Sequence, residues 1–288
     1  ALLARKNIKY LGGKADPPGR KPTGRREGKT SSVSAGPSGD GFGVVEIGRT
    51  RTLTALAERS GLIQSLLAAF GAEDGGRLLR LAIHQVCEGE ALHLAESWLE
   101  ETDAPKGKGS SSSSLNRLVE SVGADENARA TFLREWIERN GKPAALIHDT
   151  TSISTYARDL LDAEWGYNRD KEKLPQINLA LVMGRESGLP LWYRIVPGSV
   201  PDVSTLALTR ELLSQYGLSE AEYSLDRGYY SNDNVVELLD GGADFTIGVP
   251  FTNEQAKRIA RQNLNGLRTA RRSFLHAGER LRHVAREY

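Results

Sequence analysis

The stretch EYSLDRGYY, at residues 222–230, decides the fold of this chain together with AALIHD, at residues 144–149. Each contains a short apolar run that ends in an aspartate, Asp226 in the first and Asp149 in the second. Short apolar runs bounded by polar or turn residues are typical of buried strands. A carboxylate at the end of such a strand is held rigidly at the edge of a sheet, where ligands approach. We therefore expect the two aspartates to lie on neighbouring strands and to share metal ions.

The sequence around the two aspartates predicts one series of strands and helices. The predicted order is three strands, a helix, a strand, a helix and a strand, at residues 144–148, 176–183, 189–196, 202–216, 223–226, 231–239 and 244–249. The turn at residues 184–188 makes the second and third strands an antiparallel hairpin. We interpret Asp202 as the structural cap of the first helix. His148 precedes Asp149 in a strand, so its side chain should point to the opposite face, which argues against a metal role.

Four motifs in this series resemble those of a known enzyme family. They are HDTTS at 148–152, Gly198 with Asp202, DRGYYS at 226–231 and FTIGVP at 245–250. Together they are similar to bacterial insertion-sequence transposases of the DDE type, and DRGYYS is the most specific of them. The resemblance covers about residues 144–250. It implies an α/β fold, a ribonuclease H-like mixed five-stranded sheet with flanking helices, preceded by a helical N-terminal domain.

The resemblance also implies metal-dependent phosphodiester cleavage and strand transfer at transposon ends. Asp149 and Asp226 would then be the catalytic and metal-binding residues, with two Mg²⁺ ions that Mn²⁺ can replace. The implied partners are double-stranded DNA, as inverted repeats and as target, and a second copy of the chain in a homodimer. Arg227 and Tyr229 are weaker candidates for binding DNA or orienting the site. A surface ion pair explains Arg227 equally well, and packing against the sheet edge explains Tyr229 better.

The third catalytic acid of this family is absent from the chain. The family has a glutamate on a late helix, within Y-x-x-R-x-x-x-E-x-x-x-x-x-x-K, and no such motif occurs here. Glu254, Glu279 and Glu287 follow the predicted core but lack this context. We therefore expect the chain to end inside an insertion, before the third acid, and to have very low activity. The alternative is an inactive remnant that at most binds DNA.

A doubly wound phosphatase or phosphotransferase is the alternative from another enzyme class. Asp149 would be its nucleophile. Such an enzyme would have a second aspartate two residues further on, where this chain has Thr151. The predicted hairpin also argues against an all-parallel sheet.

Charge and composition suggest four segments. We expect a disordered basic tail at 1–45, a helical and possibly DNA-end-binding domain at 46–142, the incomplete catalytic core at 143–250, and the start of a basic insertion at 251–288. Residues 1–50 hold ten Lys or Arg against four Asp or Glu, and residues 251–288 hold nine against three. Lys and Arg supply most non-specific DNA affinity, so the two ends are the expected DNA contacts.

Composition favours a cytoplasmic protein, and the family resemblance implies a bacterial, nucleoid-associated one. The single cysteine, Cys87, excludes internal disulfides, and no apolar run approaches the roughly 20 residues that a membrane span needs. GRREGKT at 24–30 resembles a phosphate loop but is one residue too short between its glycines and follows no apolar strand. His84, Cys87 and His93 suggest zinc, but they are only three ligands on an apolar segment, which favours core packing.

Overall fold

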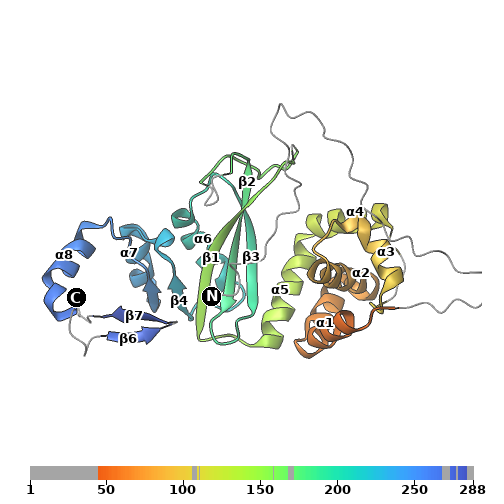
Figure 1. Cartoon of the computed structure of the whole chain (residues 1–288), viewed down its shortest axis with the longest axis horizontal. Coiled ribbons are helices and arrows are strands. Elements are labelled where there is room, and N and C mark those ends of the chain that lie inside the picture. The colour runs from red at the N-terminus through yellow and green to blue at the C-terminus, as the bar shows by residue number, and fades with distance from the viewer. Residues whose placement is uncertain are drawn as a thin grey trace, which may run out of the picture. The chain divides into compact units, whose positions relative to one another are not determined.

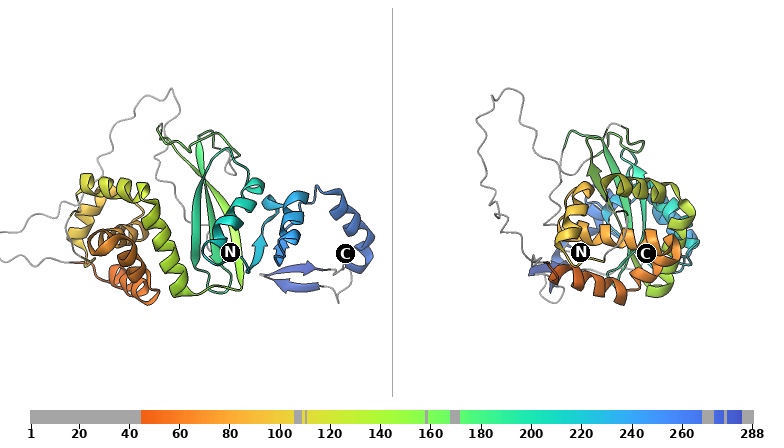
Figure 2. Two further views of the ribbon diagram at one scale, coloured as in Figure 1. Left: turned by 180° about the vertical axis from the view of Figure 1, so that it is seen from behind. Right: turned by 90° about the vertical axis from the view of Figure 1, so that its right-hand side faces the viewer.

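The computed structural model describes residues 45–105, 109, 111–157, 159–167, 172–267, 273–276 and 278–283. Residues 1–44, which hold nearly all of the predicted tail and the whole GRREGKT motif, lie outside the described residues. The chain divides into two compact units, Ala1–Asn140 and Gly141–Tyr288. The first is built of helices and the second contains a sheet (Figure 1, Figure 2). No helix of the described residues is long and apolar enough to cross a membrane.

The described part of the first unit is helical, as the sequence predicts. Its elements are α1 (Gly48–Arg59), α2 (Leu62–Cys87), the short 3-10 helix η2 (Leu92–Leu94), α3 (Ala95–Glu101), α4 (Ser112–Ala124) and α5 (Glu126–Asn140). Gly61 separates α1 from α2, because it adopts φ 78°, a conformation that favours glycine. A run of five serines occupies residues 110–114, and its last three residues begin α4. Serine is favoured at helix starts, and the buried Leu115 and Leu118 hold this helix against the unit.

One apolar cluster of the first unit joins α1, α2 and α3. Its buried members are Ala57, Leu66, Leu79, Ile83, Trp98 and Ala104. His84 lies edge-on to Trp98, with the ring centroids 5.2 Å apart. No group of three or more His, Cys, Asp or Glu side chains among the described residues is arranged to hold a metal ion. His84 is buried and Cys87 packs, partly buried, against this cluster, which agrees with the core packing that the sequence favours.

The second unit is built around a mixed five-stranded sheet. Its elements are β1 (Ala145–Ser154), β2 (Gln176–Gly184), β3 (Pro190–Pro197), η3 (Asp202–Ser204), α6 (Leu206–Ser214), β4 (Glu222–Leu225), η4 (Arg227–Tyr229), α7 (Asn232–Asp240), β5 (Phe245–Ile247), α8 (Glu254–Gln262), α9 (Leu264–Leu267), β6 (Ser273–His276) and β7 (Glu279–Arg282). The strand order in the sheet is β3-β2-β1-β4-β5, and β6 pairs with β7 separately.

The pairing directions agree with the predicted fold class. β1, β2 and β3 pair antiparallel, whereas β4 is parallel to both β1 and β5. This is the predicted ribonuclease H-like arrangement. The antiparallel hairpin excludes the all-parallel sheet that the phosphatase alternative requires.

The first strand is longer than its apolar run. Thr150 to Ser154 continue to pair with β2, ending at the pair Ser154 and Gln176. Three of these five residues are β-branched, a residue class that packs well on a pleated surface. The prediction that Asp149 ends its strand is therefore wrong. It lies inside β1, at the level where the parallel neighbour β4 ends.

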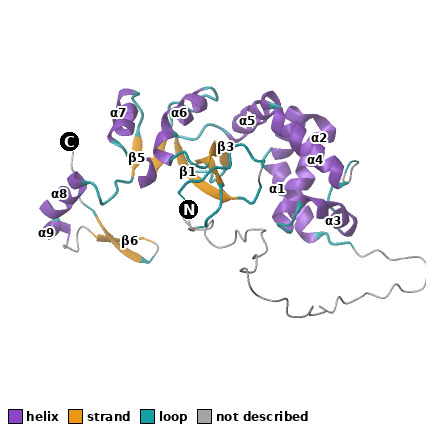
Figure 3. Ribbon diagram, turned by 90° about the horizontal axis from the view of Figure 1, so that it is seen from above, coloured by secondary structure: helices purple, strands orange, loops and turns teal. Residues whose placement is uncertain are grey.

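Two helices cover one face of the sheet. Leu146 and Tyr223, which are partners across β1 and β4, are buried on this face. The Arg210 guanidinium of α6 lies over the Tyr223 ring, 5.7 Å from its centroid. Figure 3 shows α6 and α7 along the same side of the strands, and each places a fully buried leucine there, Leu213 and Leu238. The alternate residues of β1, Asp149 among them, point to the other face.

Candidate active site

The strand register brings Asp149 and Asp226 together. The last parallel pair between β1 and β4 is His148 with Leu225, and each aspartate is the next residue of its chain segment. Asp226 keeps an extended backbone (φ −78°, ψ 174°), which continues the alternation of the strand. Neighbouring side chains of parallel strands point to the same face. Both carboxylates therefore project away from the buried His148 and Leu225, and both residues are exposed to solvent.

A backbone N–H fixes each of the two carboxylates. The N–H of Thr150 donates to Asp149 Oδ1 over 2.9 Å, and the N–H of Gly228 donates to Asp226 Oδ1 over 2.6 Å. The bond at Asp226 is a local turn of a kind that aspartate commonly makes with its own backbone two residues on, whereas Asp149 bonds the next residue within β1. Both bonds restrict the rotation of the two side chains before any ligand arrives.

A buried tyrosine links the two segments that carry the aspartates. Tyr229 is fully buried, and its hydroxyl lies 2.5 Å from Thr150 Oγ1 in a hydrogen bond. Burial raises the pKa of Tyr229 well above its ordinary value, so the hydroxyl stays protonated. The bond joins η4 to β1 directly beside the aspartates. The burial of Tyr229 agrees with packing at the sheet edge, which the sequence favours over contact with DNA. Arg227, in contrast, is exposed.

Replacing Tyr229 by Phe is expected to lower the free energy of unfolding by about 1–2 kcal/mol, because Thr150 loses its partner in a partly buried position. Urea denaturation measures this change. Tyr193→Phe is the matched control, since Tyr193 lies on β3 with 40 % of its surface exposed. Equal, small effects of the two substitutions would show that the bond to Thr150 does not stabilise the site.

His148 lies behind the aspartates and not among them. Its side chain is 1 % exposed, its ring centroid is 4.6 Å from that of Tyr229, and neither ring nitrogen has a hydrogen-bond partner among the described residues. Burial lowers its pKa to about 4. It is on the opposite face from Asp149, as the alternation of the strand predicts.

Acid is expected to destabilise the second unit through His148. The folded-state pKa of about 4 lies below the roughly 6.5 of an unfolded histidine, so the unfolded chain takes up the proton first. The stabilisation that the neutral His148 gives to the folded state is full above about pH 6.5 and is lost as the pH falls toward 4. Between pH 7 and 4.5, the free energy of unfolding of the wild type should fall by roughly 2–3 kcal/mol more than that of His148→Phe. Urea unfolding in the presence of EDTA measures both values. Parallel losses in the two proteins would refute this.

Asp202 lies nearer to the aspartate pair than the sequence indicated. It does not cap α6, because that helix begins at Leu206 and its capping position makes no side-chain hydrogen bond. A Cβ built on Gly228 would lie 2.8 Å from Asp226 Oδ1 and 3.2 Å from Asp202 Oδ2, so both carboxylates border the same small space. Asn234 fixes this arrangement, since its Nδ2 donates to the carbonyls of Val203 (2.8 Å) and Tyr229 (2.7 Å). In the sequence, the family-like motif of Gly198 and Asp202 is the feature that indicated a place for Asp202 near the site.

The late glutamates do not complete a metal site in the described residues. Glu254 is in the first turn of α8 and pairs with Lys257 at 2.7 Å. Glu279 lies in β7, and Glu287 is outside the described residues. The aspartate pair supplies hard oxygen donors next to each other, which suits Mg²⁺ or Mn²⁺ with several ligands left to water.

The family model of the transposase DDE domain matches residues 140–286, which contain all seven strands and both aspartates. The chain belongs to the transposase DDE domain family. Within this DDE domain, the five-stranded sheet is the part that brings Asp149 and Asp226 together. A search of curated proteins found no similar sequence.

Solved structures of transposases are similar at low identity. A piggyBac transposase synaptic complex with hairpin DNA is 11 % identical with a TM-score of 0.37, covering 68 % of this chain and 44 % of its own. The Mos1 transposase paired-end complex with the left transposon end is 9 % identical with a TM-score of 0.24. The match covers 69 % of this chain and 72 % of the Mos1 chain. The Mos1 mariner paired end complex with Mn is 12 % identical with a TM-score of 0.24, covering 69 % and 77 %. This chain thus spans under half of the piggyBac transposase chain.

Proposed function

We propose that this chain is the transposase of a bacterial insertion sequence, which cleaves phosphodiesters at the ends of the element and joins them to target DNA. The observation that carries the proposal is the side-by-side placement of Asp149 and Asp226 by the β1 and β4 register, in a chain of the transposase DDE domain family. Asp149 and Asp226 are the proposed catalytic and metal-binding residues. Two carboxylates on adjacent strands are a suitable framework for a pair of Mg²⁺ ions, with Mn²⁺ as a substitute.

The chemistry is hydrolysis followed by transesterification. Water attacks the phosphorus at the element end and the bond to the 3′ oxygen breaks. The freed 3′-OH then attacks a phosphodiester of the target, and the 3′ oxygen of the target strand leaves with a proton. When bound, the divalent ions lower the pKa of the attacking water and stabilise the leaving oxygen. Asp149 and Asp226 would hold the ions. The N–H groups of Thr150 and Gly228 each bind one oxygen of these carboxylates and so orient them.

Exposed arginines at the end of the chain support DNA as the partner. Arg258 and Arg261 of α8 and Arg280 and Arg282 of β7 are exposed and pair with no acidic side chain among the described residues. Arg227, exposed beside Asp226, is proposed to contact a phosphate close to the scissile bond. Neutralised phosphates release counterions, so DNA affinity should fall steeply with salt. The inverted repeats and the target are the proposed DNA substrates, a homodimer the working form, and the bacterial cytoplasm the location.

The third catalytic acid is proposed to lie beyond Tyr288. This follows from the missing Y-x-x-R-x-x-x-E-x-x-x-x-x-x-K motif and from Glu254 being engaged with Lys257. The 288-residue chain should then nick DNA very slowly in Mg²⁺, and the protein with its continuation should nick it well.

The experiment compares these two proteins on a plasmid that carries the element with its ends. Supercoiled plasmid is incubated with Mg²⁺, and nicked and linear products are quantified. Nicking by the extended protein that Asp149→Asn and Asp226→Asn both abolish is the expected result. Vigorous nicking by the 288-residue chain would refute the need for a third acid, and nicking that survives both substitutions would refute the proposed site.

A further inference from the structure

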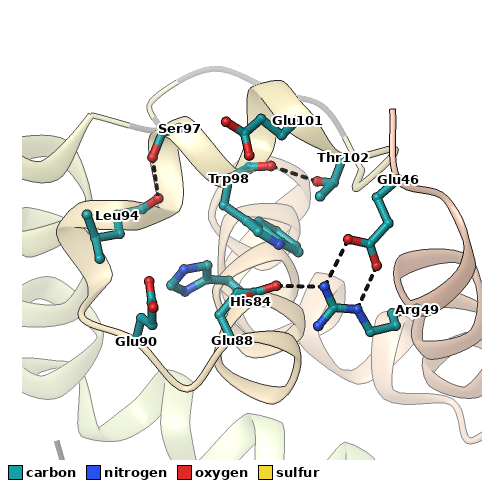
Figure 4. A pocket seen from close by; sticks show the side chains of 10 residues that line it. All are labelled: Glu46, Arg49, His84, Glu88, Glu90, Leu94, Ser97, Trp98, Glu101 and Thr102. Atoms are coloured by element: carbon teal, nitrogen blue, oxygen red, sulfur yellow. Dashed lines mark hydrogen bonds and ion pairs between the residues drawn. The ribbon is translucent and has the colours of Figure 1, made fainter. Parts of the chain in front are cut away.

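The first unit contains an acidic pocket of ≈ 520 Å³ between α2 and α3 (Figure 4). Four glutamates line it, Glu46, Glu88, Glu90 and Glu101, against a single arginine, Arg49. Such a pocket repels phosphate and attracts cations. This part of the helical unit is therefore unsuited to contact a DNA backbone.

Two of the four glutamates are already neutralised. Arg49 pairs with Glu46 at 2.6 Å and with Glu88 at 2.9 Å, and it also donates to the carbonyl oxygen of Cys87. Glu90 and Glu101 have no ion pair among the described residues. The uncompensated negative charge of the pocket therefore comes from Glu90 and Glu101, and Glu90 lies beside His84 (Figure 4).

A buried histidine points into the same pocket. His84 is 1 % exposed, and neither of its ring nitrogens has a hydrogen-bond partner among the described residues. Figure 4 shows its ring between Trp98 and Glu90. Burial lowers the pKa of His84, so the ring is neutral near pH 7 and one nitrogen is an acceptor. Buried polar groups are normally hydrogen-bonded, and this one lacks a donor.

We infer that this pocket is a binding site for a basic side chain, the guanidinium of arginine or the ammonium of lysine. The cation would donate to the unpaired ring nitrogen of His84 and to Glu90, while Trp98 offers an aromatic ring for a cation. A metal ion fits less well, because no group of three ligating side chains among the described residues is arranged to hold one. This inference is independent of the proposed transposition chemistry.

Two sources can supply such a side chain. Residues 1–44 of this chain contain nine Lys or Arg and lead into Glu46 at the rim of the pocket. The other source is a basic segment of another protein. Both present the same chemistry to the pocket.

The test uses the full chain with its histidine side chains labelled with ¹⁵N and the His84 signals assigned by His84→Gln. N-acetyl-arginine methylamide is the probe, and N-acetyl-citrulline methylamide is its uncharged control. The arginine compound should shift the His84 signals saturably, and the citrulline compound should not. Glu90→Gln should weaken binding at least about fivefold, whereas Glu96→Gln, a glutamate of α3 outside the pocket lining, should leave it unchanged. Equal shifts by both compounds, no shift by either, or no effect of Glu90→Gln would overturn the inference.

A second arm distinguishes the two sources. All nine Lys and Arg residues of the segment 1–44 are replaced together by Gln in the full chain. If these residues occupy the pocket, the variant should bind the arginine probe more tightly than wild type does. Unchanged affinity would assign the pocket to a basic segment of another molecule.

Discussion

Changing Asp226 to Asn is expected to weaken Mn²⁺ binding to the second unit at least about tenfold, or ~1.4 kcal/mol. The substitution keeps the shape of the side chain and the acceptor for the Gly228 N–H, and it removes only the charge and one hard oxygen. Asp149→Asn should have the same effect, because the two residues are neighbours in the β1 and β4 register. Electron paramagnetic resonance of free Mn²⁺ measures the binding constant.

The control for this prediction is Asp240→Asn. Asp240 is an exposed aspartate at the end of α7 in the same unit. It should leave Mn²⁺ binding unchanged. A loss of similar size in all three variants would mean that Mn²⁺ responds to overall charge and not to this pair.

Changing Gly228 to Ala is expected to weaken Mn²⁺ binding without unfolding the protein. The added Cβ would lie 2.8 Å from Asp226 Oδ1 and 3.2 Å from Asp202 Oδ2, closer than atoms normally approach. Carboxylate ends can rotate away, so the cost in stability should be small, on the order of 1 kcal/mol. The rotation displaces Asp226 from its position beside Asp149, however, and we expect binding at least about tenfold weaker.

Gly123→Ala is the matched control for the added methyl group. Gly123 is in α4, and a Cβ there would meet nothing within 4 Å. This variant should bind Mn²⁺ as wild type does. Wild-type binding by Gly228→Ala as well would show that the Asp226 carboxylate has no metal-binding role in this geometry.

The sequence predicted the order of strands and helices along the second unit well, because local patterns determine it. The alternating residues of QINLALVM and the glycines of the following turn are enough to predict the hairpin of β2 and β3. Ser231 is the side-chain cap of α7, as serine at that position suggests. These signals act over a few residues, so a single sequence shows them.

The parts that sequence reasoning missed depend on long-range contacts. The end of β1 is determined by the pairing of Ser154 with Gln176 of β2, 22 residues further along the chain, and not by its apolar run. Asp202 approaches Asp226 because Asn234 donates to the carbonyls of Val203, which follows Asp202, and of Tyr229, which lies shortly after Asp226. Tyr229 is buried because Thr150 offers its hydroxyl a partner. None of these contacts has a local sequence pattern.

Iron-mediated cleavage of the backbone tests the paired-aspartate metal site most directly. Fe²⁺ replaces Mg²⁺, and peroxide with ascorbate then generates radicals that cut the chain close to the bound ion. We predict cuts near residues 149 and 226 together, located by mass spectrometry, which excess Mg²⁺ suppresses and which Asp149→Asn removes at both positions. Cuts elsewhere, or cuts near these residues that persist in Asp149→Asn, would contradict the account.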